Sequence, residues 1–134
     1  MKSFIYARAV QAALIGIAMT GAATLARADI KDYEFQLIDQ TVKKGDAVIS
    51  VRLVHKPDGK PVPNAVIFAT RLDMAPDGMQ EMATKIAPML STEPGVYKFK
   101  ATLSMEGGWQ LSLGAKVQGE TGTVENKLVL KATP

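Results

Sequence analysis

Apolar and polar residues alternate along most of the chain after residue 28, and this period of two limits the fold more than any other feature of the sequence. Side chains on a β-strand point alternately to opposite faces, so such alternation predicts strands with one buried face. Turn-forming Gly, Pro and Asp residues separate the alternating segments. The pattern predicts six strands, at residues 33–37, 47–53, 66–74, 97–105, 109–117 and 124–130.

A seventh strand is predicted near residues 84–91, where Pro88 restricts it to the edge of a sheet. Short strands in this number, separated by frequent turns, predict an all-β fold, an immunoglobulin-like β-sandwich of about seven strands. An amphipathic helical pattern at 78–85 is too short to form a stable helix. The inward face of the strand at 66–74 is predicted to carry Val66, Phe68, Thr70, Leu72 and Met74.

The first 28 residues have the pattern of a secretory signal peptide. Lys2 and Arg8 supply a basic start, an Ala-rich apolar run follows, and Ala26-Arg27-Ala28 has the small-x-small form of a cleavage site. Cleavage leaves residues 29–134 as one domain, expected outside the cytoplasm and without stable membrane insertion. An uncleaved anchor is the alternative, because the apolar run approaches the length of a spanning helix.

Charge and composition exclude several classes of function. The chain carries a formal charge of +3, but the basic residues of the signal, which has no acid, account for that excess. The remaining domain is therefore balanced in charge, which argues against a nucleic-acid binder. Without Cys and with His55 as the single His, the domain cannot form a Cys-ligated or multi-His metal site. Nothing supplies an acid, a base and a nucleophile together, so we expect no enzyme.

Methionine is concentrated in one part of the predicted domain. Thioether sulfur is a soft, neutral ligand that suits Cu(I) and Ag(I) better than harder ions. Three methionines fall in the polar, Gly- and Pro-containing segment 73–82, and an exposed Met in such a segment has no packing role. The methionines of this region are Met74, Met79, Met82, Met89 and Met105.

The predicted strand directions bring most of these methionines together. Met74 and Met105 are expected to end two strands on their inward faces at the same end of the sandwich, beneath the segment with Met79 and Met82. The predicted metal site is formed by Met74, Met79, Met82 and Met105, with Trp109 as a cation–π lid. Met89 is predicted to lie away from it and to be structural.

The alternative is that these methionines and Trp109 only fill the core, because Met suits irregular gaps and a large aromatic is normally buried. Two other features have simple structural interpretations. His55 is expected to be a rim residue, and Asp73 and Asp77 are expected to cap and turn their loop. The Gly107-Gly108 pair is expected to form a turn.

Three segments of the chain resemble the YtkA-like/FixH-like family: Arg71–Met79, Pro94–Phe99 and Leu103–Leu111. The Gly108-Trp109 step and the run 116–121 are also similar to domains attached to periplasmic adaptors of copper and silver efflux systems. The resemblance implies an immunoglobulin-like sandwich in the periplasm, with a role in copper handling or in the assembly of copper-dependent respiratory complexes.

Two hypotheses of function follow. The first is a periplasmic domain that binds or delivers Cu(I) through its methionines, with Ag(I) as a second ion. The second is a metal-free interaction module that docks on an efflux or respiratory-oxidase assembly partner.

Overall fold

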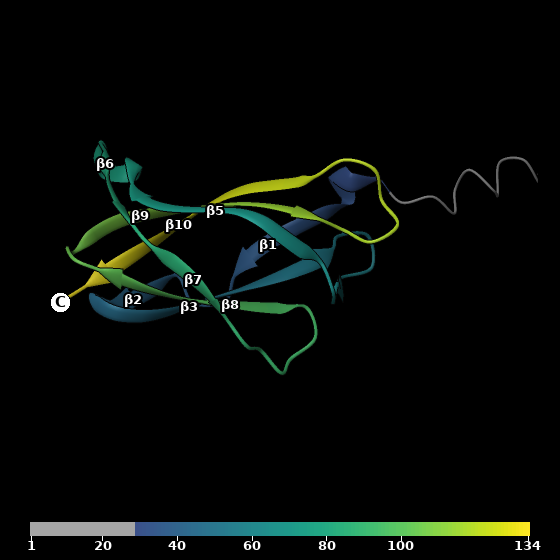
Figure 1. Cartoon of the computed structure of the whole chain (residues 1–134), viewed down its shortest axis with the longest axis horizontal. Helices are drawn as coiled ribbons and strands as arrows, with labels where there is room; N and C mark the ends of the chain where they lie inside the picture. The colour runs from purple at the N-terminus through teal and green to yellow at the C-terminus, as the bar shows by residue number, and fades with distance from the viewer. Residues whose placement is uncertain (1–28) are drawn as a thin grey trace, which may run out of the picture.

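The computed structural model describes residues 29–134, which form two antiparallel-rich β-sheets packed face to face (Figure 1). The predicted signal peptide lies outside the described residues. The first sheet has the order β1-β3-β8-β7, with the short β4 paired to β3. Its strands are β1 (Tyr33–Leu37), β3 (Gly45–His55), β4 (Lys60–Pro61), β7 (Ile86–Met89) and β8 (Val96–Leu103).

The second sheet has the order β2-β10-β9-β5-β6. β2 runs parallel to β10, and the other pairs are antiparallel. Its strands are β2 (Thr41–Lys43), β5 (Val66–Met74), β6 (Met79–Thr84), β9 (Gly107–Lys116) and β10 (Val124–Thr133). Two single-turn 3₁₀ helices complete the described part: η2 (Ile30–Asp32) and η3 (Ala75–Asp77). The predicted immunoglobulin-like β-sandwich is confirmed.

The core lies between the sheets and is formed by the inward faces that alternation predicted. On β3, β8 and β9 buried and more exposed positions alternate along most of each strand. Trp109 is the largest of the fully buried side chains and pairs in register with Leu130 of β10. The other large, fully buried side chains are Phe35, Ile49, Leu53, Leu72, Met74, Leu103, Leu111 and Leu130.

The predicted edge strand near residues 84–91 is also confirmed, as β7, and Pro88 lies in it. The segment just before it differs from expectation, because residues 79–84 form β6 rather than a polar loop. β6 pairs with the end of β5 in the second sheet, whereas β7 pairs with β8 in the first. The chain therefore changes sheets at Lys85, and Figure 1 shows β7 running diagonally away from β6.

The inward face predicted for β5 is wrong in its first half. A bulge shifts the pairing of β5 with β9 between Ile67 and Ala69. Ile67 consequently packs against the core, whereas Phe68 is 54% exposed. Leu72 and Met74, beyond the bulge, are buried as predicted. One extra residue in a strand reverses the alternation, which explains why a single phase could not describe the whole strand.

Candidate functional site

The end of β5 is a tight reversal that positions the first candidate ligands. Asp73 Oδ1 accepts a hydrogen bond from the backbone N–H of Ala75 at 3.0 Å, which starts η3. Gly78 ends η3 in the left-handed region, at φ 75°, a conformation that Gly adopts without steric cost. Asp73 thus turns the loop as the sequence predicted. The chain then returns as β6 directly beside the strand it left.

Met74 and Met79 face each other across this reversal, because they are register partners of β5 and β6. The next β5 residue in the register, Asp73, pairs with Ala83, so residues 80–82 bulge out of the ladder. Met82 lies in that bulge. Met79 and Met82 are half-buried and both pack against the core. The expectation that they lack a packing role is therefore wrong.

Arg71 links this part of β6 to β5 through side-chain hydrogen bonds. Its Nε donates to Asp73 Oδ2 at 2.7 Å, and its Nη2 donates to the backbone carbonyl of Gln80 at 2.9 Å. Asp73 is 4% exposed and the only buried charged side chain among the described residues. A buried carboxylate requires such a partner, because an uncompensated charge in the interior is costly. The hydrogen bond from Arg71 to Gln80 therefore anchors the first residue of the bulge that contains Met82.

Met105 lies in the bend that connects β8 with β9. The prediction that it ends an inward strand face is wrong: β8 stops at Leu103, and Met105 is 40% exposed. Its backbone carbonyl accepts a hydrogen bond from Trp109 Nε1 at 3.0 Å. The side chain at the bend is thus accessible, while its backbone is tied to the core.

The start of β9 lies against η3 and Met74. A Cβ atom on Gly107 would lie 3.1 Å from the methyl carbon of Met74 and against the carboxylate of Asp77. Asp77 Oδ2 also accepts a hydrogen bond from the N–H of Gly108 at 3.1 Å. Gly107 and Gly108 are the first two residues of β9, so the prediction that they form a turn is wrong; the bend lies at Met105 and Glu106. Their missing side chains instead permit the close approach of η3, and Asp77 binds the start of β9 as well as turning its own loop.

Met74, Met79, Met82 and Met105 thus gather at one end of the sandwich, which we call the methionine pole. Met74 is fully buried and forms its base, while the other three are partly or openly exposed. An exposed ion pair lies near the pole, where Lys44 Nζ is 3.8 Å from Glu106 Oε2. The pole thus places one buried and three more accessible thioether side chains at one end of the sandwich.

A family model described as YtkA-like matches residues 27–114, about two thirds of the sequence. The chain belongs to the YtkA-like family. The match contains η3, β6, β8 and the start of β9, so the methionine pole lies inside the shared region of the family.

Two solved structures are similar to this YtkA-like domain in fold. The filamin domain of Lin-41 has 16% identity and a TM-score of 0.45, with 80% of this chain and 95% of that chain covered. The ZirS C-terminal domain has 12% identity and a TM-score of 0.48, with 100% of this chain and 87% of that chain covered. A search of curated proteins finds no sequence match.

The remaining candidates of the YtkA-like domain lie elsewhere. Met89 is on the edge strand β7, where it pairs with Lys98, outside the methionine pole. Trp109 is 1% exposed and sits within the core beneath the pole. Its role as a lid over an ion stays a prediction.

His55 ends β3 at the opposite end of the sandwich from Gly45, which pairs with Leu103 near the pole. Its Nδ1 lies 3.0 Å from Asp58 Oδ1, and its ring centroid lies 5.1 Å from that of Tyr33. The backbone N–H of Lys60, and then the His55 side chain, lower the pKa of Asp58. His55 is therefore part of a rim contact, as the sequence predicted.

Harder metal ions have no comparable site in the part of the chain that the structure describes. Within residues 29–134, no three His, Cys, Asp or Glu side chains come together in a way that could hold a metal ion.

No helix among the described residues is long and apolar enough to cross a membrane.

Proposed function

We propose that this YtkA-like domain is a periplasmic accessory domain that binds Cu(I), with Ag(I) as a second ion, at the methionine pole. The observation that carries the proposal is the register pairing of Met74 with Met79, with Met82 in the adjoining bulge and Met105 exposed on the facing bend. Thioether sulfurs bind soft monovalent ions and leave harder divalent ions to other sites.

The expected division of roles follows from exposure. Met79, Met82 and Met105 are the ligands that an ion can reach, since their side chains are partly or openly exposed. Met74 is fully buried and lies beside Met79 as its register partner. Met side chains have several rotatable bonds, so small rotations can bring the sulfurs around one ion.

A metal-free interaction module remains the second hypothesis, because half-buried Met79 and Met82 also pack against the core. Core packing alone would account for their positions. On the first hypothesis the domain passes its ion to a protein partner in metal efflux or in copper-oxidase assembly. On the second it docks on the same kind of partner without carrying an ion.

Competition between the purified domain and a Cu(I) chelator distinguishes the two hypotheses. We expect Cu(I) to bind the wild type, and replacement of Met79 and Met82 by Leu to weaken binding by at least about tenfold, a loss of about 1.4 kcal/mol. Leu conserves volume and apolarity, so the fold is kept. Met89→Leu is the matched control and should bind as the wild type does.

Two outcomes contradict the copper hypothesis. One is a wild-type domain that does not compete with the chelator, and the other is an equal loss in the Met89→Leu control. The mass of the exported protein tests the location independently: we expect a chain that starts near Asp29, as cleavage after Ala28 requires.

A further inference from the structure

The outer edge of the second sheet is covered along only part of its length. β6 pairs with β5 at Leu72, Asp73 and Met74, and then leaves as β7 for the first sheet. Residues 66–71 of β5 pair with β9 on one side, and no described strand pairs with their other side. An uncovered edge presents backbone N–H and C=O groups that another strand can use.

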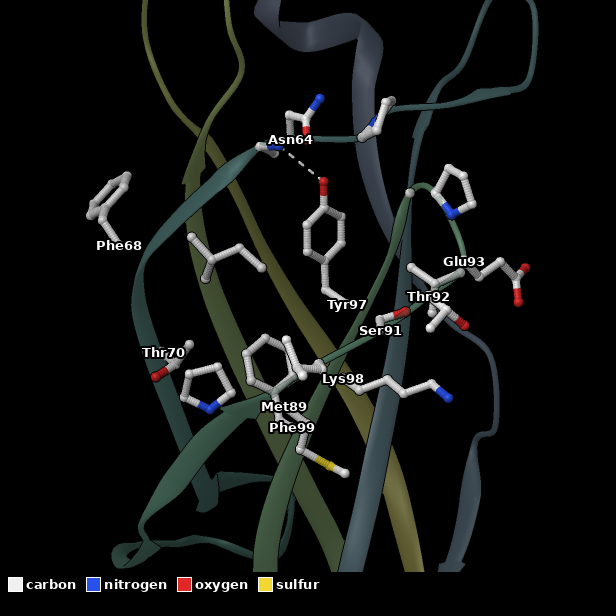
Figure 2. A pocket seen from close by; sticks show the side chains of 18 of the residues that line it. Asn64, Phe68, Thr70, Met89, Ser91, Thr92, Glu93, Tyr97, Lys98 and Phe99 are labelled. Atoms are coloured by element: carbon white, nitrogen blue, oxygen red, sulfur yellow. Dashed lines mark hydrogen bonds between the residues drawn. The ribbon is translucent and has the colours of Figure 1, made fainter.

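A cleft of about 620 Å³ opens between this edge and β7 (Figure 2). Its walls come from the start of β5, from β7 and from the loop that leads into β8. Figure 2 shows Tyr97 standing between β5 and β8, and its hydroxyl accepts a hydrogen bond from the N–H of Ala65 at 3.0 Å. Apolar side chains of Ile67, Pro88, Met89, Val96 and Phe99 also line the cleft.

The rim of the cleft carries large apolar side chains that are exposed. Phe68 of β5 and Leu90, the residue after β7, are both among the residues that line it, and Leu90 is 97% exposed. Val66, two residues before Phe68 on the free edge, is also exposed. Isolated apolar residues are ordinary on a surface, but a group around one cleft is typical of an interaction site.

The two edges that border the cleft are protected differently. β7 contains Pro88, which has no backbone N–H and so discourages strand pairing. The free part of β5 reads Val-Ile-Phe-Ala-Thr and contains neither Pro nor a charge before Arg71. This segment has high β-propensity and is suited to accept an added strand.

The charges near the cleft are mainly basic. Lys98 lines it together with the single acid Glu93. Lys85 and Arg71 line a separate hollow that shares Thr70 with the cleft. Lys116 is the register partner of Val66 at the other end of the free edge. None of these three lysines forms an ion pair among residues 29–134, where the ion pairs are Lys44–Glu106, His55–Asp58 and Arg71–Asp73.

We propose that residues 66–71 of β5 bind an extended segment of a partner protein by strand addition, and that this segment alternates apolar residues and carries carboxylates at its ends. Main-chain hydrogen bonds to the free edge supply affinity, and the apolar cleft selects alternate side chains. The basic residues at both ends of the edge complement acidic flanks and steer their approach. A second copy of this chain fits poorly, because pairing two β5 edges brings like charges together.

This site goes beyond the proposed function and is separate from it. The cleft involves the first half of β5 and the start of β8, whereas the methionine pole lies at the other ends of these two strands. A variant that loses strand binding should still bind Cu(I), and a variant that loses Cu(I) binding should still bind the added strand.

A synthetic peptide that alternates Val and Thr and carries Glu at both ends is the probe. We expect it to bind the purified domain and to slow amide hydrogen exchange within residues 66–71 more than elsewhere in the domain. The same peptide with Lys at both ends should bind at least about tenfold more weakly. A peptide with Pro at its centre should not bind, because Pro interrupts the added ladder.

Variants locate the site on the domain. Phe68→Ser should weaken binding of the Glu-ended peptide, and Lys98→Glu should reduce its preference over the Lys-ended peptide. Val129→Ser is the matched control, since Val129 is 55% exposed, close to the 54% of Phe68, and lies on β10. Phe68 and Val129 are both exposed positions, so their Ser variants should fold.

Four outcomes count against the proposal. The first is the absence of peptide binding, and the second is exchange protection outside residues 66–71. The third is protection of the same amides without peptide, growing with protein concentration, because it assigns the edge to a second copy. Equal weakening by Phe68→Ser and Val129→Ser also counts against the cleft.

Discussion

The indole Nε1–H of buried Trp109 donates to the backbone carbonyl of Met105, and the two atoms are 3.0 Å apart. This bond joins the largest fully buried side chain to the exposed bend of the methionine pole. A buried Trp N–H normally has a partner, and here the partner is the backbone of a candidate ligand. The position of the Met105 side chain therefore depends on the core.

Replacement of Trp109 by Phe tests this dependence. The change removes the bond to Met105 and leaves a gap in the core, so we expect a loss of about 2–3 kcal/mol in the free energy of unfolding. Amide exchange at residues 105–107 should accelerate as the bend loosens. Phe35→Leu is the control, because it removes core volume without touching the bend and should leave that local exchange unchanged.

Gly107 is expected to be the least replaceable glycine of the pole. It has φ 129°, and the space that a Cβ would need is taken by Asp77 and by the methyl group of Met74. Gly107→Ala should lower the free energy of unfolding by more than about 2 kcal/mol, since strain and overpacking add. Gly119 also has a positive φ, of 84°, but nothing lies within 4 Å of its Cβ position.

Gly119→Ala is therefore the control for backbone strain alone, with an expected cost of about 1 kcal/mol. Urea denaturation of both variants measures the difference. Equal costs would mean that the contact with Met74 and Asp77 is easily relaxed.

The bulge in β5 leads to a third prediction, on two apolar residues of one strand. Leu72 is fully buried beyond the bulge, so Leu72→Ala should cost about 2–5 kcal/mol of unfolding free energy. Phe68 lies in the bulge and faces outward, so Phe68→Ala should cost less than about 1 kcal/mol of unfolding free energy. The reverse ranking in urea denaturation would contradict the register shift at Ile67 and Ala69.

The same bulge shows where prediction from the sequence stops. Strands β3, β8 and β9 alternate clearly, so their faces could be predicted. The Val66-Ile67-Phe68 run is apolar throughout and does not reveal where the phase reverses. The free edge of β5 was equally hidden, because it depends on β7 leaving for the other sheet.

The gathering of the candidate methionines at one end of the sandwich could be predicted, their packing less well, and their role as a metal site stays a prediction. Strand directions were enough to place Met74 and Met105 at the same end. The spacing of Met79 and Met82 is closer to a helical period than to a strand period, and pairing with β5 overrides that local pattern. The early end of β8 at Leu103, which exposes Met105, had no signal in the apolar alternation.

The last prediction concerns the tyrosines of the described part, Tyr33 and Tyr97. Burial, and then the hydrogen bond from its hydroxyl to Glu120 Oε2 at 2.8 Å, raise the pKa of Tyr33 from 10.0 to about 12. Burial also raises the pKa of Tyr97, whose hydroxyl donates to the carbonyl of Val62 at 2.7 Å. Neither phenol of the folded domain should therefore ionise near its ordinary pKa.

The sign of the pH effect follows from these directions. The unfolded chain releases the Tyr33 proton near pH 10, whereas the folded domain holds it to about pH 12. The stability contributed by the neutral phenol is therefore complete below pH 10 and declines between pH 10 and about 12. Ultraviolet absorbance of tyrosinate, recorded with circular dichroism through an alkaline titration, measures both events. Tyr33→Phe should flatten the decline, and a folded domain that forms tyrosinate at pH 10 would contradict the raised pKa of both tyrosines.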